Sequence, residues 1–208
     1  MNCHFFATLS RMRYIERWAL MRNSCPENLS EHSLETAMIA HCLCEIGNLR
    51  YGRSLSGERA ALLALYHDVP EIITGDMPTP VKYSGEEMQK AYRELEKGAA
   101  ERLLSLLPED LRPRYEELFF PDPKSYLLRL VKAADKLSAY IKCLSEEQAG
   151  NREFRSAKKS TERILRSLSA ELPELSDFMR DFLPSYGRTL DELIGEEDGE
   201  EMPADHKI

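Results

Sequence analysis

Apolar residues recur at helical spacing along most of the chain, whereas strict alternation of apolar and polar positions is scarce. This pattern predicts an all-α fold built around a single core. Asn28 or Ser30 can cap the second helix, and the two prolines of segment 75–80 predict a loop there. The expected helices span residues 3–16, 30–47, 57–74, 84–106, 109–118, 123–149, 151–170 and 173–183.

Charge is distributed unevenly along the 208 residues. The chain carries 28 basic and 36 acidic side chains, a formal net charge of −8. From Asp191 onward there are eight acidic residues and one lysine, so residues 1–190 carry 27 basic and 28 acidic side chains, a net charge of −1. We therefore expect one domain over 1–190 and an acidic, mobile tail over 191–208. The nearly neutral body argues against a nucleic-acid polymer as partner, because such partners require a basic face.

Composition also predicts where the protein resides. The longest uninterrupted apolar run, Ala60 to Tyr66, has seven residues, against the roughly 20 that a membrane helix needs. The N-terminus lacks a basic stretch followed by an apolar one. Five cysteines without the spacing of a disulfide framework indicate reduced thiols. Together these features predict a cytoplasmic protein with no membrane partner.

His67 and Asp68 are the first pair suited to metal or acid–base chemistry. On one continuous helix over 57–74 their side chains project about 100° apart, and Glu71 projects between them. This segment is apolar on nearly all sides, so the carboxylates should be buried, where a cation would offset the cost of an unpaired charge. Pro70 removes a backbone N–H and predicts a distortion beside the pair. The alternative for His67 and Asp68 is a solvated dipeptide without function. The separate alternative for Glu71 is a structural hydrogen bond to an N–H group or an arginine.

Two other expected helices carry residues of matching chemistry. His32 opens the helix over 30–47, whose two apolar faces predict that the helix is buried. His41 points away from His32 and is expected to pack in the core. Asp135 lies at the edge of the inner stripe of the helix over 123–149, where its carboxylate needs a partner. A surface ion pair with a neighbouring lysine is the alternative for Asp135.

A cysteine phosphatase is a rival interpretation. Cys44 and Arg50 have the C-x5-R spacing that such enzymes use to hold phosphate. Their loop follows a strand and opens a helix, whereas Cys44 continues an apolar stripe near the end of an expected helix. We therefore expect Cys44 to be a buried apolar residue rather than a nucleophile.

The arrangement of His32, the pair His67-Asp68 and Asp135, each group on its own helix, resembles the H…HD…D motif of the HD-domain metal-dependent phosphohydrolases. Flanking segments resemble the bacterial 5'-deoxynucleotidases within that superfamily, among them HFFATLSRMRYIERW, LYHD, TGDMPTPVKY and VKAADKLSAYIKCL. The resemblance runs from about His4 to Asp191 and implies a single-domain HD helical bundle. Two positions depart from the family pattern: Ala19, where proline is common, and Pro70, where another residue is usual.

The resemblance implies a role for each matching residue. One divalent ion, cobalt, manganese or similar, would be held by His32, His67, Asp68 and Asp135, a nitrogen and oxygen donor set that suits such ions. The ion would lower the pKa of a bound water from about 15.7 toward about 7. Glu71 would take or return a proton.

The same resemblance implies how substrate is bound. Arg17 and Trp18 would bind the phosphate and assist catalysis, because a guanidinium group matches phosphate oxygens bidentately. Asp76 would meet the 3'-hydroxyl of the sugar, and a rigid wall beside it would exclude ribose. That wall comprises Met77, Pro78 and Thr79. Two of the implied metal ligands, His32 and Asp135, would also touch the substrate.

The implied reaction is hydrolysis of deoxyribonucleoside 5'-monophosphates to deoxyribonucleoside and phosphate by a cytoplasmic homodimer. Two alternatives remain. One is an HD-type hydrolase of another nucleotide, a triphosphate or a cyclic nucleotide. The other is a non-catalytic, metal-dependent nucleotide sensor, which would not need the proton-transferring Glu71.

Overall fold

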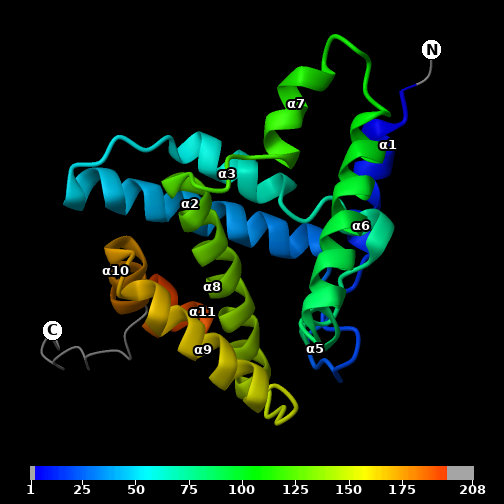
Figure 1. The fold of residues 1–208 in the computed structure, drawn as a ribbon. Helices are drawn as coiled ribbons and strands as arrows, with labels where there is room; N and C mark the ends of the chain where they lie inside the picture. Colours follow the sequence, from blue (N-terminus) through cyan, green and yellow to red (C-terminus); the bar gives the residue numbers. More distant parts are fainter. Residues whose placement is uncertain (1–2, 196–208) are drawn as a thin grey trace, which may run out of the picture.

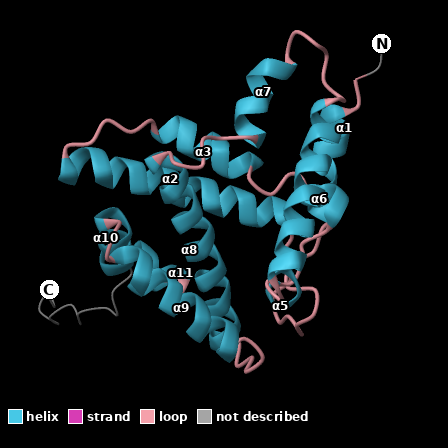
Figure 2. Ribbon diagram, viewed as in Figure 1, coloured by secondary structure: helices cyan, strands magenta, loops and turns pink. Residues whose placement is uncertain are grey.

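The computed structural model describes residues 3–195, which are helical nearly throughout (Figures 1 and 2). Within these residues, extended pairing is limited to one isolated bridge between Glu16 and Asn28. The predicted all-α class is therefore confirmed. The elements are α1 (Phe5–Leu9), η1 (Ser10–Tyr14), α2 (Leu29–Tyr51), α3 (Gly57–Tyr66), α4 (Glu71–Thr74), α5 (Thr79–Lys82), α6 (Glu86–Leu104), α7 (Arg112–Phe119), α8 (Tyr126–Gln148), α9 (Arg155–Ser169), α10 (Pro173–Asp181), η2 (Leu183–Ser185) and α11 (Leu190–Ile194).

Helix α2 lies at the centre, with α3 packed along it and α8 crossing it, while α9 and α10 cover α8 and α2 (Figure 1). Two clusters of buried apolar side chains result: a larger one that joins α2, α3, α8 and α10, and a smaller one that joins α1 to the end of α6. Along α2 the chain passes from Leu29 in the smaller cluster to Ala37 in the larger one. After α3 it passes from Ala64 in the larger cluster back to Val69 in the smaller one.

Local chemistry explains the limits of α2. Asn28 is the N-cap: its side chain accepts the backbone N–H groups of Ser30 and Glu31, and Glu31 in turn accepts the N–H of Asn28. The predicted end at residue 47 is wrong, because Gly47 lies inside the helix, where a Cβ would come within 3.1 Å of Glu174 Oε1. The helix ends at Gly52, whose φ of 62° favours glycine.

The segment predicted as one helix over 57–74 is broken at Tyr66. A turn over 67–70 separates α3 from α4, which starts directly after Pro70. Proline has no N–H to continue the hydrogen bonds of α3, so the distortion predicted beside Pro70 is a full break. His67 and Asp68 therefore lie in a turn, and the angles expected for them on a continuous helix do not apply.

The prediction that α2 is buried on two faces is also wrong. Leu34 and Met38 expose 53% and 60% of their surface, and His41 is exposed rather than packed in the core. His32 is fully buried, as predicted. An apolar stripe on a helix therefore does not require a packing partner within the same chain.

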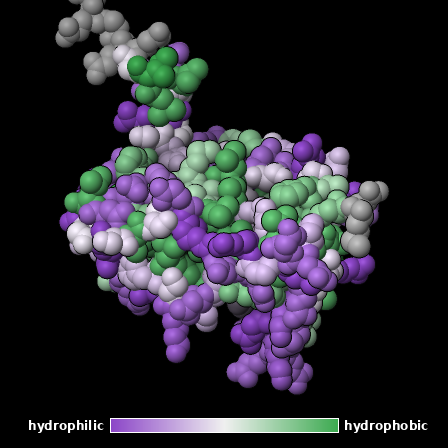
Figure 3. Space-filling model, turned by 90° about the horizontal axis from the view of Figure 1, so that it is seen from above, coloured by the Kyte–Doolittle hydropathy of each residue, from purple (hydrophilic) through white to green (hydrophobic). Residues whose placement is uncertain are grey.

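Other limits differ by a few residues. Segment 3–16 is a short α1 followed by the 3-10 helix η1, and the loop expected over 75–80 ends in the one-turn helix α5, with Pro80 in its first turn. Residues 190–194 form α11, whose exposed leucines and isoleucine make an apolar group beside the grey C-terminal residues in Figure 3. The expected mobile tail covers 191–208, of which residues 191–194 belong to α11 and residues 196–208 lie outside those described. Of the described helices, none is both long and apolar enough to cross a membrane.

Candidate active site

Three separate elements bring the predicted metal ligands together. His32 comes from the first turn of α2, His67 and Asp68 from the turn after α3, and Asp135 from the middle of α8. His32 Nε2 lies 3.3 Å from Asp135 Oδ1 and 3.6 Å from Asp68 Oδ2, and His67 Nε2 lies 3.0 Å from the same oxygen of Asp68. The two imidazole rings are 5.3 Å apart. The cluster sits where the larger and smaller apolar clusters meet.

The donor atoms fit a divalent ion. His32, His67 and Asp135 each offer one ligand atom, and these atoms lie within 4.8 Å of one another. The Nε2 atoms of both histidines are buried without a hydrogen-bond partner among the described residues. Nδ1 of His67 lies 2.6 Å from the carbonyl oxygen of Ala64, to which it can donate, so Nε2 is the nitrogen of His67 that could bind an ion. An ion would satisfy both orphaned nitrogens.

The two carboxylates of the cluster are held ionised, as ligands must be. Burial acts to raise the pKa of Asp68, but His67 outweighs it and lowers that pKa to about 2. Burial likewise opposes ionisation of Asp135, yet Lys136 and His32 hold its pKa well below the usual range. Lys136 Nζ lies 2.8 Å from Asp135 Oδ2. Asp135 thus makes both contacts: the ion pair with a neighbouring lysine that was the alternative, and the contact with His32.

Glu71 is the first residue of α4 and is 6% exposed. Its Oε2 atom is buried without a hydrogen-bond partner among the described residues. Burial first, and then the carboxylates of Asp68 and Asp76, raise the pKa of Glu71 to about 10. Glu71 lines a cavity of about 360 Å³ together with His67 and Asp68. It therefore lies beside the histidine cluster, as predicted, without bonding to it.

The extended bridge between Glu16 and Asn28 places Arg17 next to the start of α2. Arg17 is 9% exposed, its Nη1 lies 3.4 Å from Asp68 Oδ2 and its Nε lies 3.4 Å from Glu27 Oε2. Burial acts to lower its pKa, but the surrounding carboxylates, Asp68 foremost, raise that pKa. The guanidinium group is thus held beside the predicted metal ligands, and its predicted contact with phosphate stays a prediction.

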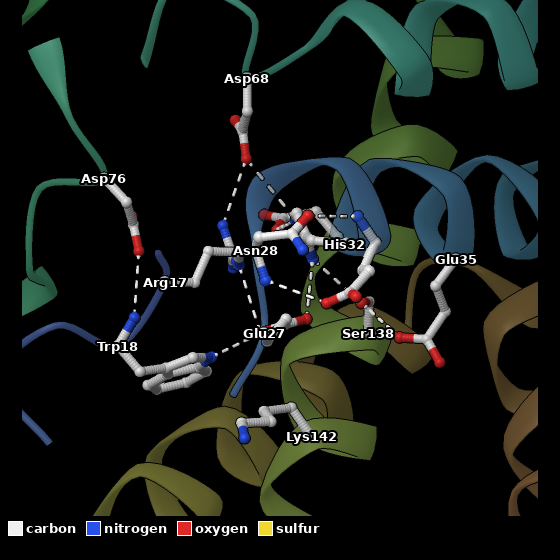
Figure 4. Close-up of polar contacts among 12 residues, drawn as sticks. Arg17, Trp18, Glu27, Asn28, His32, Glu35, Asp68, Asp76, Ser138 and Lys142 are labelled. Carbon is white, nitrogen blue, oxygen red and sulfur yellow. Dashed lines mark hydrogen bonds and ion pairs between the residues drawn. The ribbon is translucent and has the colours of Figure 1, made fainter. Parts of the chain in front are cut away.

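Trp18 has an unusual backbone, with a φ of 59° in the left-handed region. Its backbone N–H donates to Asp76 Oδ2 at 3.3 Å and its indole N–H donates to Glu27 Oε2 at 2.8 Å (Figure 4). The centroid of its ring lies 5.2 Å from that of Phe154. Trp18 is half-buried rather than a core residue. These contacts hold a conformation that costs a tryptophan free energy, as is common at binding sites.

Asp76 joins the cluster through that contact with Trp18, as Figure 4 shows. Met77 and Pro78, which follow it, are half-buried, and Thr79 is exposed at the start of α5. The role predicted for these residues at the sugar stays a prediction. Cys44, by contrast, lies in the middle of α2, fully buried, and burial raises the pKa of its thiol to about 12. It is therefore no nucleophile, as expected.

Comparison with known proteins places this geometry in a family. The model of the family described as 5'-deoxynucleotidase YfbR-like matches residues 4–186. The chain belongs to the YfbR-like 5'-deoxynucleotidase family.

Individual relatives agree with the family match. A 5'-deoxynucleotidase of Vibrio cholerae is 46% identical over 195 residues, covering 91% of this chain and 97% of that protein. The 5'-deoxynucleotidase YfbR of Escherichia coli is 46% identical over 194 residues, covering 91% and 95%. The family and enzyme class predicted from the sequence are thereby confirmed.

Solved structures show the same fold. An HD-domain phosphohydrolase from Listeria innocua aligns with a TM-score of 0.78 at 23% identity, covering 88% of each chain. A cyanophage S-2L HD phosphohydrolase, solved with dA and one catalytic Zn²⁺ ion, aligns with a TM-score of 0.61 at 20% identity, covering 88% of this chain and 96% of that chain. The predicted HD-type helical bundle is confirmed.

The YfbR-like site contains a carboxylate that sequence reasoning missed. Glu27 accepts from the indole of Trp18, lies beside the guanidinium of Arg17, and places Oε1 3.7 Å from His32 Nδ1. It sits in a loop directly before the cap residue Asn28, where no periodicity distinguishes it. Its contacts come from the fold, which brings the segment around Arg17 alongside the start of α2.

In this YfbR-like chain, Glu146 of α8 fastens the loop that joins Trp18 to Glu27. Its carboxylate accepts the N–H groups of Ser24 and Cys25 at 2.9 and 3.0 Å, the amide of Asn151 at 2.7 Å, and the ammonium group of Lys142. Burial acts to raise the pKa of Glu146, but these hydrogen bonds outweigh it and lower that pKa to about 2. An ionised side chain thus anchors the loop.

Glu146→Gln should lower the free energy of unfolding by about 1–3 kcal/mol at neutral pH, because Lys142 and the loop amides lose a charged acceptor. A carboxyl group whose pKa is lower in the folded chain stabilises the fold above the pKa of the unfolded chain, near about 4.3. The difference between wild type and variant should therefore be full above about pH 5 and shrink as the pH falls toward 2. Urea unfolding at a series of pH values measures it.

Glu147→Gln is the matched control. Glu147 is exposed and pairs with Lys158 at the surface, so its loss should cost less than about 1 kcal/mol. Equal losses for the two variants, or a Glu146→Gln difference that persists in acid, would contradict the anchoring role.

Proposed function

We propose that this chain hydrolyses deoxyribonucleoside 5'-monophosphates to deoxyribonucleoside and phosphate with one divalent ion. The observation that carries the proposal is the pair of orphaned Nε2 atoms of His32 and His67, which face the carboxylates of Asp68 and Asp135 beside the guanidinium of Arg17. Relatives that are 46% identical bear the name 5'-deoxynucleotidase, which supports the substrate class.

His32, His67, Asp68 and Asp135 would hold the ion, which supplies Lewis acidity for activating water. Arg17 would orient the phosphate by a bidentate contact with two of its oxygens. In the reaction the bond between phosphorus and the 5'-oxygen breaks, a bond from phosphorus to the water oxygen forms, and a proton passes to the 5'-oxygen. We assign the transfer of protons to Glu71, which lies beside the ligand cluster and is shielded from solvent.

Trp18, Asp76 and the residues after it would bind the rest of the substrate. Asp76 Oδ2 accepts from the backbone of Trp18, and we propose that the other oxygen of this carboxylate meets the 3'-hydroxyl of the sugar. Selection for deoxyribose would come from the wall formed by Met77, Pro78 and Thr79. The departure at Pro70 suits this site, since proline is favoured where a helix begins and Glu71 follows directly.

The proposal is tested by phosphate release. Protein stripped with EDTA should release no phosphate from deoxyribonucleoside monophosphates, and adding back cobalt, manganese, zinc or nickel singly should restore activity and identify the ion. Deoxyribonucleotides should be hydrolysed faster than matched ribonucleotides. Equal rates with and without chelator would eliminate the metal mechanism. Tight, metal-dependent binding of deoxyribonucleotides without turnover would instead favour the nucleotide sensor. Turnover of triphosphates or cyclic nucleotides would favour the other HD-type hydrolase.

We also propose that the enzyme is a cytoplasmic homodimer. The apolar side chains of Leu34 and Met38 on the exposed face of α2 support self-association. The five free cysteines, two of them buried, support a reducing compartment. Light scattering coupled to size-exclusion chromatography should give twice the mass of the chain, and the monomer mass would refute the dimer.

A further inference from the structure

A chain of hydrogen bonds leads away from the fully buried His32. Its Nδ1 atom lies 3.0 Å from the hydroxyl oxygen of Ser138, which is also fully buried. The Ser138 hydroxyl in turn donates to Glu35 Oε2 at 2.5 Å (Figure 4). Glu35 is half-buried and lines a second cavity, of about 330 Å³, between α2, α8 and the segment around Tyr186.

The direction of these bonds determines the tautomer of His32. A serine hydroxyl has one proton, and Ser138 uses it toward Glu35, so its lone pairs face His32. The imidazole must then carry its proton on Nδ1 and donate it to Ser138. Its Nε2 atom faces Asp68 and Asp135, and in a neutral ring this atom is the one free to bind a cation.

The same three residues tie together the two helices that carry ligands. His32 and Glu35 lie one turn apart on α2, and Ser138 lies one turn beyond Asp135 on α8. The hydroxyl of Ser138 thus fixes the ring orientation of His32 and its distance from the ligand on the neighbouring helix.

We propose that Ser138 and Glu35 are positioning residues of the metal centre, and this inference rests on the proposed metal-dependent function. The hydroxyl–carboxylate pair holds the imidazole of His32 in the one tautomer and orientation that can bind a cation. Outer partners of ligating histidines act in this way, and their loss lowers metal affinity about 10–100-fold.

The first test measures metal affinity rather than activity. Ser138→Ala should weaken cobalt binding about 10–100-fold, measured by competition with a chromogenic chelator. Glu35→Gln keeps an acceptor oxygen for Ser138 and should weaken binding less. Ser145→Ala is the matched control, because Ser145 lies on the same helix and lines the same cavity as Glu35. It should bind cobalt as wild type does, whereas unchanged affinity in Ser138→Ala would overturn the proposal.

The second test uses the metal-free protein. Long-range nitrogen–proton NMR should show wild-type His32 protonated on Nδ1, and Ser138→Ala should shift it toward a mixture of tautomers with little change in unfolding temperature. Half-buried Glu35 can be replaced without opening the core, so Glu35→Ala, which removes the acceptor of the Ser138 hydroxyl, gives the same comparison if Ser138→Ala does not fold. If wild type binds no divalent ion, the proposed function fails, and the tautomer of His32 still decides the role of Ser138. A wild-type ring that carries no proton on Nδ1 would refute it.

Discussion

Asp135→Asn should abolish tight metal binding and reduce the rate of phosphate release by about 10³-fold or more. A bound ion contributes several kcal/mol of charge stabilisation to the transition state, and about 4 kcal/mol corresponds to this factor. Asparagine keeps the size of Asp135 but removes the negative charge that faces His32 Nε2 at 3.3 Å. Metal content after dialysis, together with kcat for a deoxyribonucleoside monophosphate, measures both effects.

Asp110→Asn provides the control for Asp135→Asn, because it removes an exposed carboxylate away from the cluster. It should leave metal content and kcat unchanged. Wild-type affinity in Asp135→Asn would remove Asp135 from the ligand set and leave its pair with Lys136 as its role.

Glu71→Gln should keep the metal and lose about 10²–10⁴-fold in kcat, the range that general acid–base catalysis contributes. The amide has the same shape as the carboxyl group but cannot take up or release a proton at the reacting oxygen. Because Glu71 does not bond to the histidines, metal affinity should stay within a few-fold of wild type. Steady-state kinetics and metal titration on the same preparation separate the two quantities.

Glu96→Gln is the matched control for Glu71→Gln. Glu96 lines the same cavity and pairs with Lys82. It should retain kcat near the wild-type value. A Glu71→Gln enzyme that works at full speed would exclude this residue from proton transfer and leave the reaction to other groups at the site.

Helix positions follow from the sequence wherever the cause is local. The cap at Asn28 and the apolar stripe of α8 act within one or two turns, and both lie close to where the pattern predicts them. The predicted helix end at Gly47 is wrong because a glycine can mark either a helix end or a position where another side chain, here Glu174, comes close to the backbone. The prediction that His41 packs in the core is wrong because periodicity shows that a helix face is apolar but not whether another element covers it.

The candidate site divides in the same way. His32, His67, Asp68 and Asp135 are identified by their resemblance to the H…HD…D motif, and the structure brings them together. Glu27 and Ser138, which contact His32, are not recognisable from the sequence, because each contact joins residues of different elements. Ser138 contacts a residue 106 positions away in the chain, a distance at which helical periodicity carries no information.

The predicted ligands His32, His67 and Asp68 lie on two segments that pass from one apolar cluster to the other. If the two apolar clusters moved relative to each other, the distances among the predicted ligands would therefore change before the packing inside either cluster did. A cation held by these residues would link the two clusters and would stabilise the fold by mass action. Mutations deep inside either cluster, far from any ligand, can consequently impair catalysis by misaligning this junction.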